Sequence, residues 1–322
     1  MPEPGLYGRK PPKRAPALEL SRYLTGVVPA HPAFADYLSR LSGWLMLGND
    51  SIGDCVSVTW SNTRRLVTAV LATENYPPLA EVLAFYKTQN PGFPQQDDGM
   101  DIQTALEYLV KTGGPDGVKA LGFAKVDYTS VAEVQAAIAI FGSIWTGINV
   151  QNAQETQFNA GQPWNWVPGA QVAGGHSIVV GGYGEPRPGR LAGDEDFITW
   201  AEETSFTDNF WSNGVEEAWV VLWPEHLGSA EFLAGVNLAA FAAAYTEITG
   251  QPFPAVIPPV PPVPPIPPIP PPVPGPDTNP ADVALAHSVT AWANGHHLPP
   301  SDRAVAGAIR AWLLAKGFPS GA

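Results

Sequence analysis

Cysteine is nearly absent from this 322-residue sequence, which contains a single one, Cys55. One cysteine cannot form an internal disulfide, so packing must stabilise the fold. The sequence also lacks a cysteine cluster, a His-Glu-x-x-His motif and a Gly-x-x-x-x-Gly-Lys-Ser/Thr loop. These absences argue against metal-dependent hydrolysis and against nucleotide chemistry, and we expect neither a metal nor an organic cofactor.

Long apolar runs are absent as well. No stretch of about 18 apolar residues occurs, as a membrane-spanning helix would need. Residues 1–5 carry no apolar segment of the kind found in secretory signal peptides. We therefore expect no membrane span and no signal peptide, with the protein in the cytoplasm or associated with a virion. The remaining composition, 45% hydrophobic and 15% charged residues, is typical of a globular protein with a sizeable core.

Basic residues are scarce, with 17 Lys and Arg against 30 Asp and Glu and a formal net charge of -13. They are concentrated at the N-terminus, where four of them and one glutamate give residues 1–14 a charge of +3 and leave -16 for the rest. An acidic body argues against a nucleic-acid-binding surface. The basic, proline-rich arm, residues 1–40, is expected to be a solvated tail, or else to contact an acidic partner or its own body.

Proline, in contrast, is abundant in residues 252–276, where it alternates with Val and Ile and leaves few backbone donors. This composition predicts a polyproline II linker that acts as a spacer. It separates the main domain, residues 41–251, from residues 277–322, where apolar residues at helical spacing predict a small helical hairpin. Two short helices make a thin core, so we expect the hairpin to self-associate or to bind another protein.

The main domain is predicted to be α+β, with helices first and a sheet after them. Apolar periodicity predicts helices over residues 55–72, 101–111 and 130–140. Alternating or short apolar runs predict strands over residues 143–150, 176–183, 197–201 and 218–223. Asp54 directly precedes the first helix and suits the N-cap position.

Two residues in this domain indicate nucleophilic chemistry. Cys55 stands at the predicted start of the first helix, where the helix macrodipole stabilises a thiolate. His176, in Gly174-Gly175-His176, opens an apolar strand, and folding can bring its imidazole to the thiol.

Taken together, these segments resemble the papain-like cysteine peptidases, in order, over roughly residues 48–224. The segment before Cys55 is similar to one in which that family has a glutamine six residues before the nucleophile, and Asn49 fills this position. The other matching segments are a Gly-rich turn and helix, a helix followed by a strand, and the histidine hairpin, at residues 98–114, 134–148 and 174–184.

The resemblance implies a two-lobed fold, with the nucleophile helix in a helical lobe facing an antiparallel β lobe. It also implies a mechanism. His176 takes the Cys55 proton, the thiolate attacks an amide carbonyl, Asn49 and the Cys55 N–H receive the negative charge, and water clears the thioester. The implied substrate is a protein or a cell-wall peptide.

The third member of the triad has several candidates. The family has an orienting asparagine two residues before a tryptophan, and aligning on Trp200 puts Ile198 there, which cannot accept a hydrogen bond. Counting the hairpin from Phe197 gives Glu202, whose carboxylate can orient an imidazole. Asn209 is a third choice, and Glu202 is favoured.

Other departures leave an alternative open. Val56 replaces the family's aromatic residue, Asn49 has a shorter reach than glutamine, and the Asp54 carboxylate beside Cys55 disfavours a thiolate. The alternative is a catalytically inactive papain-like module that serves as a bacteriophage virion component or another assembly protein, anchored by its C-terminal helices.

Overall fold

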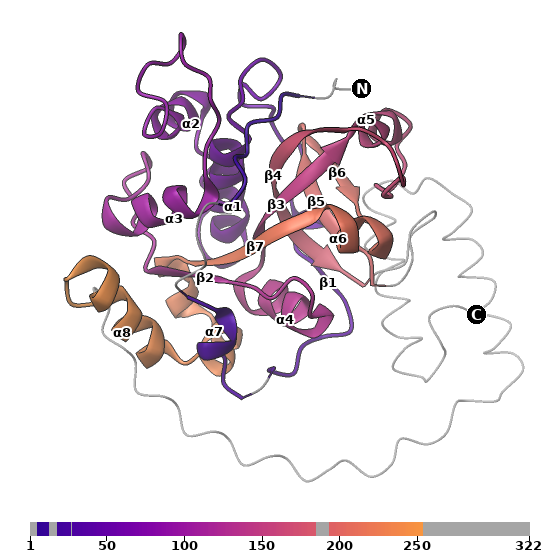
Figure 1. Ribbon diagram of the computed structural model, residues 1–322. Coiled ribbons are helices and arrows are strands. Elements are labelled where there is room, and N and C mark those ends of the chain that lie inside the picture. The colour runs from indigo at the N-terminus through magenta and orange to yellow at the C-terminus, as the bar shows by residue number, and fades with distance from the viewer. Residues whose placement is uncertain (1–4, 13–17, 27, 185–192, 254–322) are drawn as a thin grey trace, which may run out of the picture. The chain divides into compact units, whose positions relative to one another are not determined.

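The computed structural model describes residues 5–12, 18–26, 28–184 and 193–253, which belong to one compact unit (Figure 1). The C-terminal hairpin and all but the first two residues of the polyproline linker lie outside the described residues. Among the described helices, none is both long enough and apolar enough to cross a membrane.

The first lobe is helical and is organised around α1, Cys55–Leu71 (Figure 1). Helices α2, Leu79–Tyr86, and α3, Ile102–Lys111, belong to the same lobe. Their apolar faces, together with that of α1, form one buried cluster. Such amphipathic helices gain stability mainly from this packing and little from their intrinsic propensity.

The second lobe is an antiparallel sheet with the strand order β2-β7-β3-β4-β5-β6, and β1 pairs with β4 outside this order. The strands are β1 (Ala35–Asp36), β2 (Gly122–Lys125), β3 (Ile144–Gln151), β4 (Val172–Tyr183), β5 (Glu195–Thr199), β6 (Glu202–Ser205) and β7 (Val215–Leu222). The central strands β3 and β4 are buried along most of their length, so they bring residues from distant parts of the sequence together in the core.

The remaining helices surround this sheet (Figure 1). They are α4 (Val131–Phe141), α5 (Asn152–Asn159), α6 (Asp208–Gly214), α7 (Ala230–Gly235), α8 (Leu238–Thr249) and three 3₁₀ turns, η1 (Leu20–Arg22), η2 (Leu38–Arg40) and η3 (Pro224–Gly228). Helix α4 begins where the Ser130 side chain accepts a hydrogen bond from the Glu133 N–H. It ends at Gly142, whose φ of 76° is favourable for glycine.

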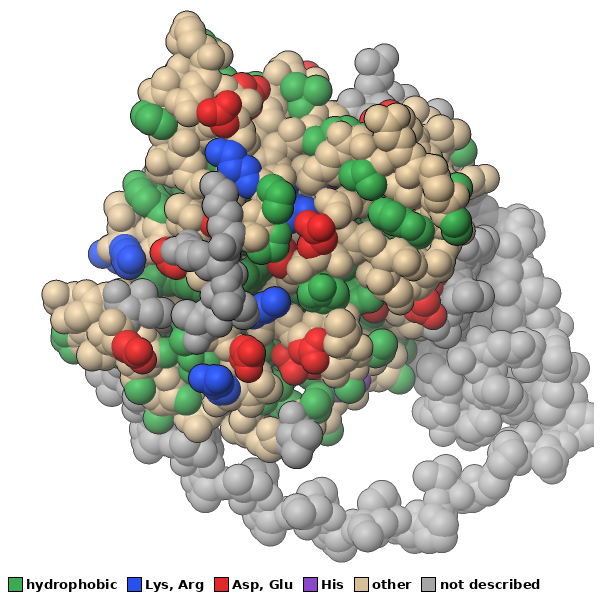
Figure 2. Space-filling model, in the orientation of Figure 1, with side chains coloured by type: hydrophobic (Ala, Val, Ile, Leu, Met, Phe, Trp, Pro, Cys, Tyr) green, Lys and Arg blue, Asp and Glu red, His purple; other side chains and the backbone are tan. Residues whose placement is uncertain are grey.

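The predicted α+β class is confirmed, and the three predicted helices correspond to α1, α3 and α4 within one residue at each end. Strand β4 begins four residues before the predicted start, because it continues through Gly174 and Gly175, which strand patterns do not favour. On the face shown in Figure 2, hydrophobic side chains form small, separate patches and basic side chains are isolated from one another. This is the surface expected of a chain that buries most of its large apolar side chains.

Candidate active site

Cys55 is the first residue of α1, and its position is fixed by a chain of hydrogen bonds that links the helix to the sheet. Trp145 Nε1 on β3 donates to Ser177 Oγ on β4 at 2.7 Å, and Ser177 Oγ donates to Thr59 Oγ1 at 3.0 Å. Thr59 Oγ1 in turn donates to the Cys55 carbonyl oxygen at 2.9 Å. The start of the helix is therefore held directly against β4, where the two lobes meet.

His176 lies on β4, opposite Ile148 of β3, and is 2% exposed. Its Nε2 is 2.8 Å from Thr199 Oγ1 at the end of β5, and its ring centroid is 5.3 Å from that of Trp200. Among the described residues, Nδ1 has no hydrogen-bond partner. Thr199 therefore binds the Nε2 edge of the imidazole and Trp200 packs against the ring, while Nδ1 stays without a hydrogen bond to the described residues.

The two lobes bring three of the sequence-predicted site residues to one small cavity. Asn49, Cys55 and His176 all line it, together with Thr199 and Trp200. No hydrogen bond joins the Cys55 thiol to the ring, since Nδ1 lacks a partner. The arrangement can support nucleophilic chemistry only if the thiol and Nδ1 come into contact.

The structure does not bring Glu202 or Asn209 to His176. Glu202 is exposed at the start of β6, where it pairs across the hairpin with Thr199. Asn209, on α6, is exposed and donates to Asn165 Oδ1 and to the Trp166 carbonyl oxygen, both at 2.9 Å. The residue that meets the imidazole is Thr199, which the sequence reasoning missed.

Thr199 was not predicted because the strand that precedes Trp200 was assigned the wrong end from the sequence. Trp200 and Ala201 have positive φ angles of 45° and 64°, so the β5–β6 turn begins directly after Thr199. The residue immediately before Trp200 therefore faces the histidine, and Ile198, one residue earlier, lines the cavity without offering an acceptor. The hydroxyl of Thr199, within the predicted strand and directly before Trp200, was the available signal.

We expect Thr199→Val to lower the free energy of unfolding by about 1–3 kcal/mol, because it leaves both nitrogens of a buried imidazole without partners. The measurement is urea denaturation followed by tryptophan fluorescence. Glu202→Gln is the matched control and should change stability little. A larger effect of Glu202→Gln than of Thr199→Val would show that Glu202 is the residue coupled to His176.

Asn49, the predicted oxyanion-stabilising residue, is 2% exposed, and its side-chain amide already binds a carbonyl. Asn49 Nδ2 donates to the Leu6 carbonyl oxygen at 3.0 Å and to the Ile52 carbonyl oxygen at 3.1 Å. The Leu6 carbonyl belongs to the N-terminal arm. A peptide carbonyl of the chain itself thus occupies the donor expected to serve a substrate.

Residues 5–12 of the arm run along the junction of the two lobes. On the helical lobe, the Leu6 N–H donates to the Asn49 carbonyl at 2.6 Å and the Lys10 N–H donates to the Met100 carbonyl at 2.8 Å. On the sheet, the Arg9 N–H donates to the Gly175 carbonyl at 3.0 Å. The expectation of a solvated tail is therefore wrong for these residues, and contact with the chain's own body is what is found.

The arm passes so close to the nucleophile helix that glycine is required at residue 8. A Cβ added to Gly8 would lie 1.7 Å from the Gly53 carbonyl oxygen, far inside contact distance. Across from it, the Met100 N–H donates to the Gly8 carbonyl at 2.7 Å. Any side chain at residue 8 would therefore have to displace the arm or the loop before α1.

Burial of the site suppresses both charged forms of the Cys55–His176 pair. Burial raises the pKa of the Cys55 thiol to about 12, and hydrogen bonds from the Ser177 and Gly8 backbones only partly oppose this. Burial, followed by the charge of Arg9, lowers the pKa of His176 to about 3. With the arm in place, the thiol and the imidazole are both neutral at physiological pH.

Asp54 occupies the N-cap position of α1, but its side chain makes no capping hydrogen bond, contrary to the sequence prediction. It is 0% exposed, and among the described residues neither carboxyl oxygen has a hydrogen-bond partner. Burial raises the pKa of Asp54 to about 8. No group of three or more His, Cys, Asp or Glu within the described ranges could hold a metal ion.

No protein-family model matches the sequence, and no curated protein matches it. Solved structures do match. Xylellain, a cysteine protease from Xylella fastidiosa, is 14% identical with a TM-score of 0.52, covering 69% of this chain and 97% of its own. ProCathepsin B S9 from Trypanosoma congolense is 12% identical with a TM-score of 0.49, covering 68% of this chain and 87% of its own. The proform of the ragweed pollen cysteine protease Amb a 11 is 12% identical with a TM-score of 0.47, covering 61% and 67%.

The likeness to xylellain concerns the three-dimensional arrangement of elements, since the two sequences share few residues. It covers nearly the whole of that protein and 69% of this chain. The chain therefore has the fold of the papain-like cysteine peptidases.

Proposed function

We propose that this protein is a papain-like cysteine peptidase whose N-terminal arm holds it in a latent state. The observation that carries the proposal is the convergence of Cys55, His176 and Asn49 on one cavity between the lobes. These are a nucleophile, a base and an oxyanion donor, the set that acyl transfer through a thioester requires. The papain-like fold supports the assignment, because the thiol stands at the start of the helix that faces the sheet.

The proposed reaction follows from the atoms that are available once the arm has left. Nδ1 of His176 takes the proton from Cys55 Sγ, and the thiolate attacks the carbonyl carbon of a peptide bond. Asn49 Nδ2 and the Cys55 N–H stabilise the negative charge on the oxygen. The imidazolium then gives its proton to the departing amine, which leaves a thioester. Water, deprotonated by His176, hydrolyses the thioester and restores the thiol.

Release of the arm also changes the protonation of the pair in the required direction. Water entering the cleft removes the burial that raises the pKa of Cys55 and lowers that of His176. The two pKa values then approach each other, and the N-terminus of α1 favours the thiolate further. The latent and active states thus differ in whether water reaches the Cys55 thiol and the His176 imidazole.

The test is peptide hydrolysis by the full-length Gly8→Ala variant, in which we expect the new Cβ, 1.7 Å from the Gly53 carbonyl oxygen, to displace the arm. We expect this variant to cleave a mixed library of protein-derived and cell-wall peptides, and the native chain to cleave far less. Gly8→Ala combined with Cys55→Ser is the control and should be inert. A variant whose thiol reacts freely with iodoacetamide while every peptide stays intact would overturn the proposal.

That negative result would favour the second candidate, a catalytically inactive module used in a bacteriophage virion or another assembly. One observation favours it here: the cleft is filled by the chain itself, and the Arg9 side chain anchoring the arm is only 1% exposed. A cleft filled in this way excludes a substrate, which is consistent with a module that does not catalyse a reaction.

Both candidates include a proposed anchoring role for residues 277–322, which lie outside the described residues. We expect the full chain to self-associate or retain a protein partner. Trp292, Trp312 and Leu313 have more apolar surface than two short predicted helices can bury between them. Sedimentation of the full chain beside a chain ending at Phe253 provides the measurement. If both sediment as monomers and neither retains a partner, the anchoring role is excluded.

A further inference from the structure

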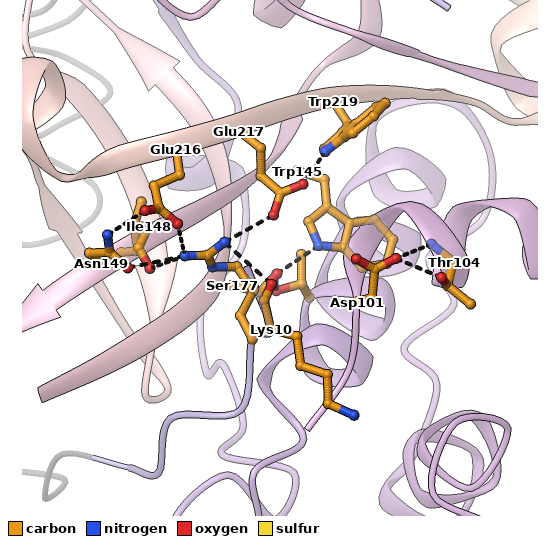
Figure 3. A network of polar contacts seen from close by, with 12 residues as sticks. Lys10, Asp101, Thr104, Trp145, Ile148, Asn149, Ser177, Glu216, Glu217 and Trp219 are labelled. Carbon is orange, nitrogen blue, oxygen red and sulfur yellow. Dashed lines mark hydrogen bonds and ion pairs between the residues drawn. The ribbon is translucent and has the colours of Figure 1, made fainter. Parts of the chain in front are cut away.

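The side chain of Arg9 fills a pocket between β3 and β7 and is 1% exposed. Its Nη1 is 3.1 Å from Glu217 Oε1. Its Nη2 pairs with the Glu216 carboxylate and also donates to Asn149 Oδ1 at 3.2 Å and to the Ile148 carbonyl at 3.3 Å. Figure 3 shows these acceptors converging on one point from the two strands. The pocket thus offers four acceptors to one guanidinium group.

Residues of the body also orient the acceptors of this pocket. Trp219 Nε1 donates to Glu217 Oε2 at 2.8 Å, and Asn149 Nδ2 donates to Glu216 Oε1 at 2.6 Å (Figure 3). Gly147 leaves room for the ligand, since a Cβ there would lie 2.7 Å from the Arg9 Cδ. The carboxylates are therefore oriented by neighbours on β3 and β7 as well as by Arg9.

The pocket adjoins the candidate nucleophile. The residue bound in it, Arg9, donates its N–H to the carbonyl of Gly175, which directly precedes His176. The preceding residue of the arm, Gly8, lies against the loop before α1, where a Cβ added to it would be 1.7 Å from the Gly53 carbonyl oxygen, and its backbone lowers the pKa of the Cys55 thiol. A peptide that puts an arginine side chain in this pocket accordingly has its backbone within a residue or two of the sulfur.

An empty pocket would favour one class of ligand. Glu217 is 2% exposed, so loss of Arg9 leaves a buried carboxylate without a cation, which is costly. An arginine head distributes its donors in a planar fork that matches several acceptors at once, whereas the lysine ammonium is a compact point charge. Four acceptors from two strands therefore select a guanidinium over an ammonium or an uncharged group.

We propose that this pocket, formed by Ile148, Asn149, Glu216 and Glu217, is a substrate subsite that binds an arginine side chain within two residues of the bond cleaved. Arg9 occupies it in the latent protein as an internal substitute for that arginine. The proposal rests on the proposed peptidase function and adds a substrate class to it.

A binding experiment tests the pocket without any catalysis. In the full-length Arg9→Ala variant, N-ethylguanidinium should raise the melting temperature saturably, whereas N-ethylurea, its uncharged counterpart, should not. Adding Glu217→Gln to this variant should abolish the response. An equal response to both compounds, or an unchanged response after Glu217→Gln, would overturn the subsite.

A cleavage experiment tests the substrate role and does not depend on how Arg9→Ala folds. The full-length Gly8→Ala variant is given peptides in which one arginine moves through the positions around the cleaved bond, each paired with a citrulline peptide of the same shape. We expect kcat/KM to be at least about tenfold higher for arginine than for citrulline at one position. Glu217→Gln in the Gly8→Ala background should remove the difference.

The two ways of failing are distinguishable. Cleavage of arginine and citrulline peptides at equal rates would overturn the subsite and leave the peptidase function standing. Cleavage of neither peptide by a variant with an accessible thiol would overturn the peptidase function and, with it, the substrate role of the pocket, even if N-ethylguanidinium binds.

Discussion

Cys55 in the full-length Gly8→Ala variant is expected to react with iodoacetamide at pH 8 roughly a thousandfold faster than in the native protein, because only the thiolate is alkylated. In the native protein the pKa of this thiol is about 12. At pH 8 this leaves about one thiolate in ten thousand, against roughly one in four for a thiol with the ordinary pKa of about 8.5. The added Cβ would lie 1.7 Å from the Gly53 carbonyl oxygen, and we expect this clash to displace the arm.

Mass spectrometry of the intact chain measures this rate directly, since Cys55 is the sole cysteine and one added group reports it. Gly228→Ala is the matched control, because a Cβ at Gly228 meets nothing within 4 Å. It should react as slowly as the native protein. If the native thiol reacts as fast as that of the urea-unfolded chain, the arm does not cover Cys55 in solution.

The parts of the site that could be predicted from sequence are those set by local signals. Cys55 is recognisable as a helix start, and His176 as the opening of an apolar strand. Each depends on periodicity within about ten residues, which packing then reinforces. The nucleophile helix and the histidine strand were accordingly found in the predicted order.

The partner of His176 depends on strand register, which sequence determines poorly where a turn has unusual backbone angles. The positive φ angles of Trp200 and Ala201 end β5 at Thr199 and place its hydroxyl at the imidazole. A shift of one residue reverses which side chains face the site. That is why Ile198 and Glu202 were considered and Thr199 was not.

The position of the arm in the cleft depends on contacts with residues far away in the sequence. A short, basic, proline-rich segment is typical of a solvated tail, since it cannot bury enough apolar surface by itself. Here Arg9 is buried because Glu216 and Glu217, more than 200 residues later, form a pocket for it. No local pattern near Arg9 indicates this pairing.

Asp54→Asn is expected to remove a pH-dependent loss of stability on the order of 1.4 kcal/mol per pH unit between pH 6.5 and 7.5. Burial raises the pKa of Asp54 to about 8, well above the ordinary value near 3.9. Between these two values the folded protein holds a proton that the unfolded chain has released. Stability from this group is therefore complete below about pH 4 and is lost as the pH rises to about 8.

The range from pH 6.5 to 7.5 is chosen because two other buried groups, His176 and Cys55, affect stability mainly below and above it. The pKa of His176 is lowered to about 3, so its neutral form adds stability above pH 6.5 and loses it as the pH falls toward 3. The pKa of Cys55 is raised to about 12, so its contribution falls only above about pH 8.5. Between pH 6.5 and 7.5, Cys55 contributes almost nothing to the slope, and the contribution of His176 is the same in the native protein and in the Asp54→Asn variant, so the difference between the two slopes reports Asp54.

Urea denaturation at several pH values in this window, for the native protein and the variant, gives the two slopes. Asp50→Asn, an exposed position in the same loop, is the matched control and should keep the native slope. Equal slopes for the native protein and Asp54→Asn would mean that Asp54 is ionised and solvated in the folded state. The carboxyl beside Cys55 would then carry a negative charge at neutral pH, and it would directly oppose formation of the Cys55 thiolate once the arm has left the cleft.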